Sequence, residues 1–373
     1  MTDHSKPRKV LISCWYALSL MMMTLTWAAA GAAETASLRV DLSQGAITSL
    51  ENLLTGETYT REVEAAGVES TLRYMAPGPN LREARAGEEG ASLEAQVTTE
   101  GTDLLVQQLG ERAEGGVAGL WLGLGPLDAD QVRLLIPGVG GVELDADSKV
   151  ADVSYYYPGS WGTTALIIQG QKGGVLVSAD EPGSAFAAMR ITRLKTAWRI
   201  SLLTMADAPW DGRTECASLK WRFTAYQGAW PVAANLQKAK LRDAFDLTPI
   251  AERQPEWARH IRCIVKITGT GDFETPLRDL AAQVEPSKTL LYLPHWRTNP
   301  YDVMYPDYTP NEWALSFIRY AHQLGFKVMA HGNLVGISPQ HPRVEEFRDA
   351  IERDPATHGE VGWYLDRESP GQI

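Results

Sequence analysis

The sequence predicts a multi-domain β plus α/β protein, in which an antiparallel β-sandwich precedes the first βα units of an incomplete (β/α)8 barrel. Three observations lead to this prediction. Short strand-like runs recur from residue 37 to about 226, the apolar period becomes helical over 232–245, and residues 289–333 follow the order strand, loop, helix, strand. An eight-fold barrel needs roughly 200–250 residues. A chain of 373 residues whose barrel starts near 259 is therefore expected to hold only part of one.

The sandwich domain is expected over 36–245, with a connecting helix at its end, 232–245. Runs such as QVRLLIP, ALIIQG and WRISLLTM are separated by turn residues and lack a helical period, which is typical of antiparallel sheets. Residues 246–258 contain two prolines and are predicted to be the linker. The barrel domain follows over 259–373.

Within the barrel domain, KTLLYLP is predicted to be a buried strand and FKVMAHGN the next strand. The helix between them is expected to start with Thr309 as N-cap, Pro310 at its first position and Glu312 closing a capping box. A second helix is predicted from Pro342, with these side chains facing inward: Val344, Phe347 and Ile351. Two βα units cannot close a barrel, so the strand that starts at Thr289 is expected to keep an unpaired edge and an uncovered apolar face.

Charge and cysteine content narrow the classes of partner. The formal net charge is −11 and no basic stripe is present, which argues against binding of nucleic acid or of an anionic membrane surface.

Of the three cysteines, Cys14 lies near the N-terminus, while Cys216 and Cys263 could pair in an oxidising compartment. Spacing alone does not decide whether they do. No zinc-type cysteine pair is present, and no cofactor is expected.

The N-terminus has the order of a secretory signal. Lys6, Arg8 and Lys9 precede an apolar run from residue 10 to 30, which ends in small residues. This pattern predicts a signal peptide over 1–33, cleaved after Ala32 or Ala33, and a secreted or periplasmic protein without stable membrane association afterwards. The apolar run is also long enough to span a bilayer, so an uncleaved anchor is the alternative.

Candidate site residues gather just past the two strands of the barrel domain. They are His295, Trp296 and Arg297 after the first strand, Asp302 and Asp307 in the following loop together with Tyr305 and Tyr308, and His331 and Asn333 after the second strand. Barrel enzymes carry their chemistry at the carboxyl ends of the strands. Aromatic rings beside charged and amide groups suit a sugar, whose faces stack while its hydroxyls form hydrogen bonds.

Two other interpretations of these residues remain open. Arg297 and Asp302 could form a structural pair, with His331 as a structural residue. A metal held by His295 and His331 is conceivable, although no HExxH or His-x-His spacing supports it.

Catalytic residues are not identified by the sequence. A glycosidase needs two carboxylates at a defined separation, and the loop carboxylates of the barrel domain lack the position of a residue fixed at a strand end: Asp302, Asp307, Asp366 and Glu368. There is no GxSxG motif for a nucleophile-elbow hydrolase.

Several motifs together resemble a known family. LPHWRTNPYDVMYPDYTP, GFKVMAHGN and RDPATHGEVGWYLDRESPGQI are similar to the glycoside-hydrolase-like domain of unknown function 6259, itself distantly similar to endo-α-N-acetylgalactosaminidases. GAITSLENLLTGETY and WRFTAYQGAWPVAANLQKAK resemble the mutarotase-like sandwich that precedes such barrels. The resemblance implies a retaining mechanism with an Asp nucleophile after a fourth strand, and no residue of this chain matches that position.

The sequence therefore predicts a glycoside hydrolase-like protein that acts on O-glycosidic bonds of an oligo- or polysaccharide, with a chain that lacks the catalytic carboxylates. The alternative is a non-catalytic carbohydrate-binding or structural secreted protein.

Overall fold

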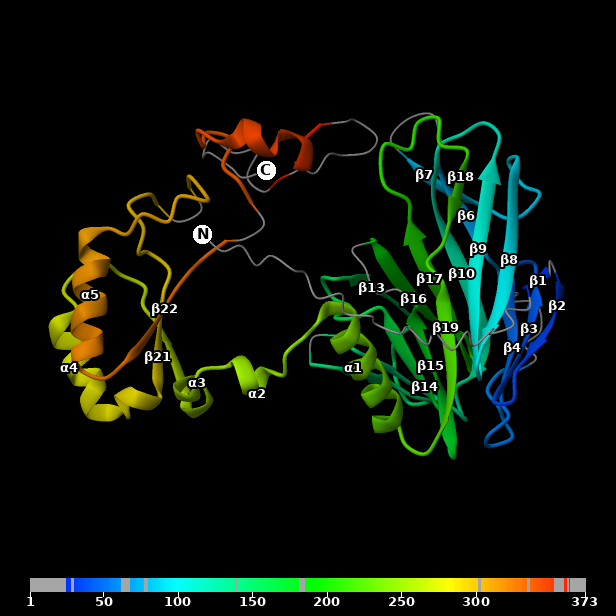
Figure 1. Cartoon of the computed structure of the whole chain (residues 1–373), viewed down its shortest axis with the longest axis horizontal. Helices are drawn as coiled ribbons and strands as arrows, with labels where there is room; N and C mark the ends of the chain where they lie inside the picture. The colour runs from blue at the N-terminus through cyan, green and yellow to red at the C-terminus, as the bar shows by residue number, and fades with distance from the viewer. Residues whose placement is uncertain are drawn as a thin grey trace, which may run out of the picture.

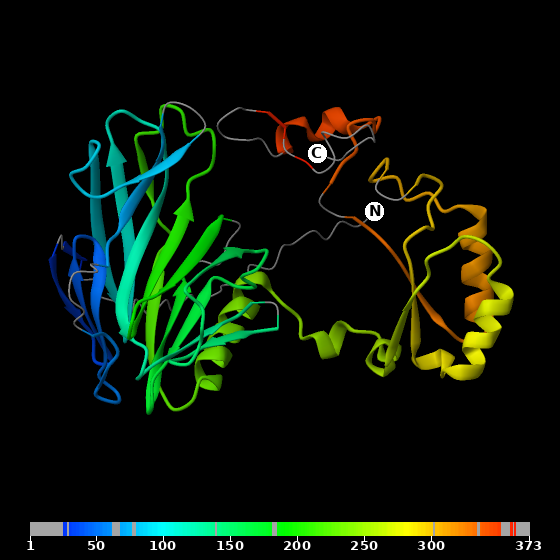
Figure 2. The same cartoon turned by 180° about the vertical axis from the view of Figure 1, so that it is seen from behind.

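The computed structural model describes residues 25–27, 30–61, 68–76, 80–138, 140–180, 185–300, 303–333, 336–351, 359–360 and 362. Figures 1 and 2 show a large β-sandwich and a smaller α/β unit, joined by a segment with the short helices α2 (Ile250–Arg253) and α3 (Glu256–His260). These helices occupy the predicted linker. Most of the predicted signal peptide lies outside the described residues, while its last residues, 30–33, belong to a strand. Within the described part of the chain, no helix is long and apolar enough to cross a membrane.

The first sheet of the sandwich, sheet A, has nine strands among the described residues. Its order is β1-β8-β9-β19-β15-β14-β11-β12, with β18 also paired to β9, and its pairs are antiparallel. The strands are β1 (Leu25–Trp27), β8 (Ala91–Glu100), β9 (Asp103–Arg112), β11 (Arg133–Ile136), β12 (Val142–Leu144), β14 (Ala165–Gln169), β15 (Gly173–Ala179), β18 (Glu215–Ala217) and β19 (Trp221–Gln227).

The second sheet, sheet B, has ten strands over the same described ranges. Its order is β13-β16-β17-β10-β4-β3-β2, with β5 on β4, β6 on β10 and β7 on β6. It is mixed, because β4 runs parallel to β10 where Ile47 meets Leu124. The strands are β2 (Ala30–Glu34), β3 (Leu38–Ser43), β4 (Ala46–Asn52), β5 (Glu57–Thr58), β6 (Thr71–Met75), β7 (Leu81–Ala84), β10 (Val117–Asp128), β13 (Asp152–Tyr157), β16 (Ala187–Arg193) and β17 (Ala197–Met205).

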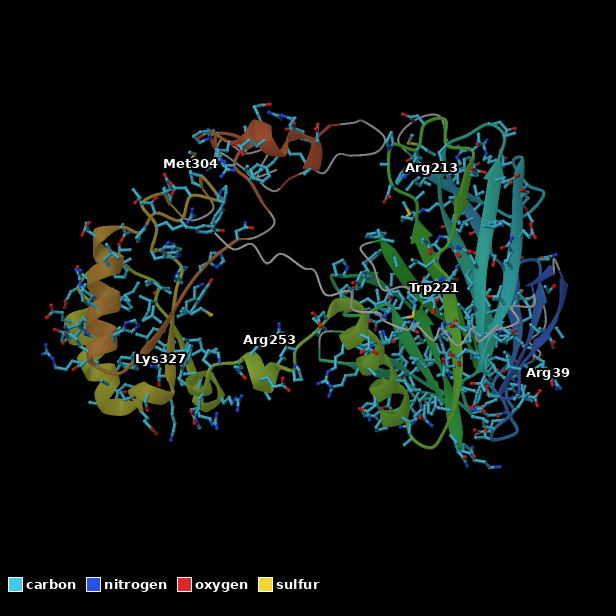
Figure 3. All side chains as sticks on the ribbon, in the orientation of Figure 1. Arg39, Arg213, Trp221, Arg253, Met304 and Lys327 are labelled. Atoms are coloured by element: carbon cyan, nitrogen blue, oxygen red, sulfur yellow. The ribbon has the colours of Figure 1, made fainter. Side chains whose placement is uncertain are left out.

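Alternation along the strands builds the core between the two sheets. In β3, every second residue is buried, beginning with Leu38, while the residues between them are more exposed. Trp221 of sheet A is fully buried and stacks on Trp161, with ring centroids 6.2 Å apart. Figure 3 shows Trp221 within the sandwich. The prediction of a chain dominated by β-sheets is thus confirmed, although sheet B is mixed and not purely antiparallel as predicted.

Helix α1 (Pro231–Phe245) is the predicted connecting helix, and it packs on sheet A. Ala233 is fully buried against that sheet, and Gln237 donates a hydrogen bond to the Thr163 hydroxyl at 2.9 Å. Lys240 lies 3.7 Å from Asp180, which also accepts a hydrogen bond from Arg222 of β19 at 2.6 Å. Polar groups thus fasten the outer end of α1 to the strands beneath it.

The α/β unit is built on three parallel strands, in the order β20 (Cys263–Lys266), β21 (Thr289–Leu293) and β22 (Lys327–Ala330). Figure 1 shows α4 (Glu274–Gln283) and α5 (Glu312–Gln323) on one side of this sheet. The short 3-10 helix η1 (Pro286–Lys288) precedes β21. β20 and α4 were not predicted from the sequence. The prediction that β21 keeps an unpaired edge is wrong, because β21 is the central strand and is paired along both edges.

The predicted ends of two helices also need correction. The N-cap of α5 is Asn311, whose side chain accepts the Ala314 N–H at 2.7 Å, and Thr309 lies outside the helix with its hydroxyl on Asp307. The helix predicted from Pro342 is the 3-10 helix η2 (Val344–Ala350). Phe347 is exposed there and does not face inward as predicted, whereas Val344 and Ile351 are buried.

Neither Cys216 nor Cys263 forms a disulfide. Cys216 lies in β18 of the sandwich and Cys263 in β20 of the α/β unit, so the two belong to different sheets.

Candidate functional site

The candidate site lies at the carboxyl ends of β21 and β22. These strands are parallel neighbours, with Leu293 opposite Ala330, so the residues that follow them emerge side by side. Figure 3 shows this arrangement, with Met304 of the loop after β21 and Lys327 at the start of β22 toward opposite ends of the unit. The sheet therefore brings together Trp296, His331 and Asn333, as their positions after the strands predict.

Trp296 connects the two strand ends. Its indole N–H donates a hydrogen bond to the carbonyl oxygen of His331 at 2.7 Å. Its ring lies parallel to that of Tyr308, with an interplanar angle of 1° and centroids 6.1 Å apart. The Tyr308 hydroxyl in turn donates to the Asn333 carbonyl and accepts the Asn333 N–H at 3.2 Å. The two rings form a half-buried aromatic platform fixed at both ends.

His331 lies among tyrosine rings beside this platform. Its Nδ1 is 2.6 Å from the hydroxyl of Tyr292, and the Tyr305 ring centroid is 6.5 Å from that of its imidazole. Tyr292 was missed as a site residue because it sits inside a strand that reads as uniformly apolar. The period of the strand could have identified it, since Leu291 and Leu293 face the helices and Tyr292 faces the other side of the sheet.

Arg297 organises the loop between β21 and α5. The residue is only 4% exposed, and its guanidinium donates hydrogen bonds to the carbonyl oxygens of Pro300, Val303 and Asp307 at 3.0–3.1 Å. It also lies 3.8 Å from the centroid of the Tyr305 ring. Asp302, its predicted structural partner, lies outside the described residues. The geometry makes Arg297 the centre around which the loop folds.

Asp307 is engaged with its own loop. One carboxylate oxygen accepts the hydroxyl of Thr309 at 2.7 Å and its N–H at 3.0 Å, and the other accepts the Asn299 amide at 2.7 Å. These hydrogen bonds, led by that of the Thr309 hydroxyl, and the nearby Arg297 charge hold the pKa of Asp307 below its ordinary value. A carboxylate kept anionic in this way is poorly suited to donate a proton to a leaving group.

The remaining predicted residues lie at the rim. His295 is exposed, and the side-chain oxygen of Asn333 accepts the Gly336 N–H at 3.1 Å. Over the described ranges, no group of three or more His, Cys, Asp or Glu side chains is placed to hold a metal ion. Asp366 and Glu368 lie outside those ranges. In the loop from 294 to 311, as far as it is described, Asp307 is the only carboxylate.

Comparison with solved structures finds a similar fold in one protein whose structure is known in several states. The ligand-free α-N-acetylgalactosaminidase NagBb from Bifidobacterium bifidum matches with a TM-score of 0.65 and 15% identity, over 92% of this chain and 65% of that one. Its GalNAc complex gives a TM-score of 0.66 at 15% identity, over 92% and 64% of the two chains. This chain thus spans about 65% of the length of the structure it matches. Such an identity shows a shared fold and no more.

A weaker match is the GH36 α-galactosidase AgaB from Geobacillus stearothermophilus. Its TM-score is 0.37 and its identity 10%, over 89% of this chain and 46% of that one. No family model matches the sequence, and a search of curated proteins finds no match. The resemblance to the domain of unknown function 6259 accordingly stays a prediction.

Proposed function

We propose that this chain carries the sugar-binding side of a glycoside hydrolase site, directed at an O-glycosidic bond of an oligo- or polysaccharide. The observation that carries the proposal is the platform of Trp296 and Tyr308, fixed at the carboxyl ends of two parallel strands beside His331 and Asn333. Aromatic surface beside a few convergent polar groups is the usual composition of a small-molecule site. The fold shared with NagBb supports the same assignment.

N-acetylgalactosamine is the first ligand to test, because it occupies the NagBb complex with which this chain shares its fold. The platform would stack on one face of the sugar ring, and the exposed His295 and half-buried Asn333 would meet its hydroxyl groups. Arg297 would act as a positioning residue, because its charge is already used by the loop carbonyls.

The described residues do not supply the pair of carboxyl groups that hydrolysis would need. Glycosidases place two carboxyl groups about 5–9.5 Å apart across the bond that they cleave. Asp307 is held anionic by Thr309 and Asn299, and the proposal therefore gives it a structural role. The second candidate function is a non-catalytic carbohydrate-binding protein, and the observation that favours it is that both carboxylate oxygens of Asp307 are bonded within its own loop. Carbohydrate, and neither nucleic acid nor a membrane surface, is the proposed partner in both cases.

Isothermal titration of the full chain with N-acetylgalactosamine tests the proposal. We expect measurable binding that Trp296→Ala weakens at least tenfold, equivalent to about 1.4 kcal/mol. Trp296→Phe retains an aromatic ring but loses the hydrogen bond to His331, so its affinity for the sugar should lie between those of the parent protein and the Trp296→Ala variant. Trp257→Ala, which removes a half-exposed tryptophan from α3, is the matched control. Absence of binding, or equal losses in the Trp296→Ala and Trp257→Ala variants, would overturn the proposal.

A nitrophenyl α-N-acetylgalactosaminide separates the two candidate functions. No release of nitrophenol by a chain that binds the sugar supports the binding protein. Release that survives in Asp307→Asn would place the catalytic carboxylates elsewhere in the chain and restore the enzyme.

Secretion is a further part of the proposal. Cleavage after Ala32 or Ala33 would remove most of β2, which pairs only with β3 among the described strands. The mass of the protein recovered from the producing cell should therefore lack residues 1–32 or 1–33. An intact N-terminus would favour the membrane anchor.

A further inference from the structure

A polar cavity lies on the sandwich, among residues that take no part in the candidate sugar site. It has a volume of about 320 Å³ and is lined by side chains of five strands of sheet B, among them Thr71, Glu83, Trp121, Arg190, Arg199 and Ser201. Nothing in the proposed sugar site uses these residues. The volume of the cavity is within the range of small-molecule sites, about 300–1,000 Å³.

The register of sheet B explains why these residues meet. Gly123 of β10, Ser201 of β17 and Arg190 of β16 lie opposite one another in one row. Arg199 is two residues from Ser201 on the same strand, so it points to the same face, about 7–8 Å diagonally from Arg190. A side chain at Gly123 would collide with the Glu69 carbonyl oxygen, 2.5 Å from its ideal Cβ. The segment carrying Glu69 therefore packs on Gly123 and forms a wall of the cavity.

Trp121 fixes the floor of the cavity. It is only 5% exposed, and its indole N–H donates a hydrogen bond to Glu83 Oε1 at 3.0 Å. The guanidinium of Arg190 lies over its ring at 4.7 Å from the centroid. Both Glu83 and Arg190 are thus held in place before any ligand arrives.

The charges of the cavity are incompletely paired. Arg85 forms ion pairs with Glu69 and Glu88, and Glu83 is bonded to Trp121. In contrast, neither Arg190 nor Arg199 has a carboxylate within 4 Å in the part of the chain that the structure describes. Both are half-buried and on the same face, where two like charges are unfavourable unless an anion lies between them. The lining as a whole balances three glutamates against three arginines, but among the described residues no carboxylate is paired with Arg190 or Arg199, so the position between these two guanidinium groups can accept an anion.

We propose that this cavity binds a sugar acid, with its carboxylate or sulfate group between Arg190 and Arg199. A guanidinium suits either oxyanion, because its planar N–H groups match two oxygens at once. The carboxylates of Glu69, Glu83 and Glu88 at the rim accept hydrogen bonds from hydroxyl groups and repel a multiply charged anion. The hydroxyl of Ser201 can donate a hydrogen bond to the ligand or accept one from it. These features together select a ligand with one negative charge and several hydroxyls.

Isothermal titration of the full chain with glucuronate, glucose 6-sulfate, glucose and inorganic sulfate tests this proposal. We expect glucuronate or glucose 6-sulfate to bind at least tenfold more tightly than glucose and inorganic sulfate. Arg190→Met and Arg199→Met should each weaken that binding at least tenfold, and Arg199→Lys by less, because it retains the charge. Arg133→Met is the matched control, since Arg133 is an exposed arginine of sheet A paired with Glu143.

The outcomes are separable. Binding of glucuronate alone or of glucose 6-sulfate alone supports the proposal and identifies the oxyanion. Equal binding of glucose, or of inorganic sulfate, overturns it, as does binding that survives both methionine variants. If a methionine variant unfolds at a lower temperature than the parent protein, Arg199→Lys carries the test alone, and an unchanged affinity there overturns the role of Arg199. Trp296→Ala must leave glucuronate binding unchanged, so failure at one site does not affect the other.

Discussion

The sandwich and the α/β unit differ in how completely their sheets are covered. Between sheets A and B, large side chains such as Trp161, Trp198 and Trp221 are fully buried. Among the described residues, α4 and α5 cover one face of the sheet of the α/β unit, where Leu291, Leu293 and Phe317 pack. On its other face Ile264 is 63% and Met329 is 42% exposed. The better-covered region provides the scaffold, and the less-covered region carries the candidate sugar site.

Among truncations to alanine or methionine, the largest effect should follow from a change in the sandwich core. Trp221→Ala removes a fully buried ring that stacks on Trp161, and substitutions of this kind cost about 3–5 kcal/mol. The free energy of unfolding, from urea titration followed by circular dichroism, measures it. Trp257→Ala should cost less than about 0.5 kcal/mol, because that ring is half-exposed on α3. A small loss in the Trp221→Ala variant would mean that the core does not dominate the stability of the sandwich.

Arg297→Met should have the largest effect in the α/β unit. It removes three hydrogen bonds to loop carbonyls and leaves those carbonyls without their donor, which we expect to cost about 2–4 kcal/mol. Hydrogen exchange reports the change locally. The amides of Thr298 and Asn311, which are bonded to Thr309 and Trp296 across the loop, should lose protection, while those of β15 keep theirs.

Arg278→Met serves as the control for this change, because Arg278 is an exposed arginine of α4 in the same unit. Faster exchange in both variants would show that the loop depends on general charge, and not on the carbonyl contacts of Arg297.

The sequence was most informative where one periodic pattern decides the structure. The alternation of the sandwich strands and the helical period of α1 and α5 depend on neighbours in the chain, so both can be read directly. β20 was missed because CIVK is only four residues long, and its side chains never become fully buried. α4 was missed although Leu277 and Leu280 have helical spacing, since Pro276 and the charged residues around it weaken the pattern.

The other differences arise from side-chain contacts that a periodic pattern does not reveal. Thr309 and Asn311 are both good N-cap residues, and the choice falls to Asn311 because the hydroxyl of Thr309 is taken by Asp307. Because the carboxyl ends of parallel strands lie side by side, the sequence could predict that Trp296 and His331 are close. It could not show that Arg297 bonds to backbone carbonyl oxygens. The sandwich cavity was invisible to sequence reasoning, because its residues from 69 to 201 meet only through the strand order of sheet B.

The two structural cysteines provide a chemical comparison of the two regions. Burial raises the pKa of the Cys216 thiol to about 11 from an ordinary value of 9.0, so its thiolate fraction near pH 8 should be about 100-fold lower than usual. A Cys263→Ser variant isolates this thiol, and peptide mass spectrometry after iodoacetamide measures its rate. We expect slow alkylation that accelerates toward pH 11 and becomes ordinary in urea. Rapid alkylation of the native protein would show that β18 opens locally.

The smallest effect is expected on the open face of the α/β sheet, and it tests the comparison most directly. Ile264→Lys should change the free energy of unfolding by less than about 0.5 kcal/mol, because the side chain is already exposed. The same change at Leu202, which is fully buried in β17, should prevent the sandwich from folding, since a charge would enter an apolar core. Met329→Lys repeats the test on β22. A loss of 2 kcal/mol or more in either lysine variant of the open face would mean that this face is covered in solution, and the contrast between the two regions would disappear.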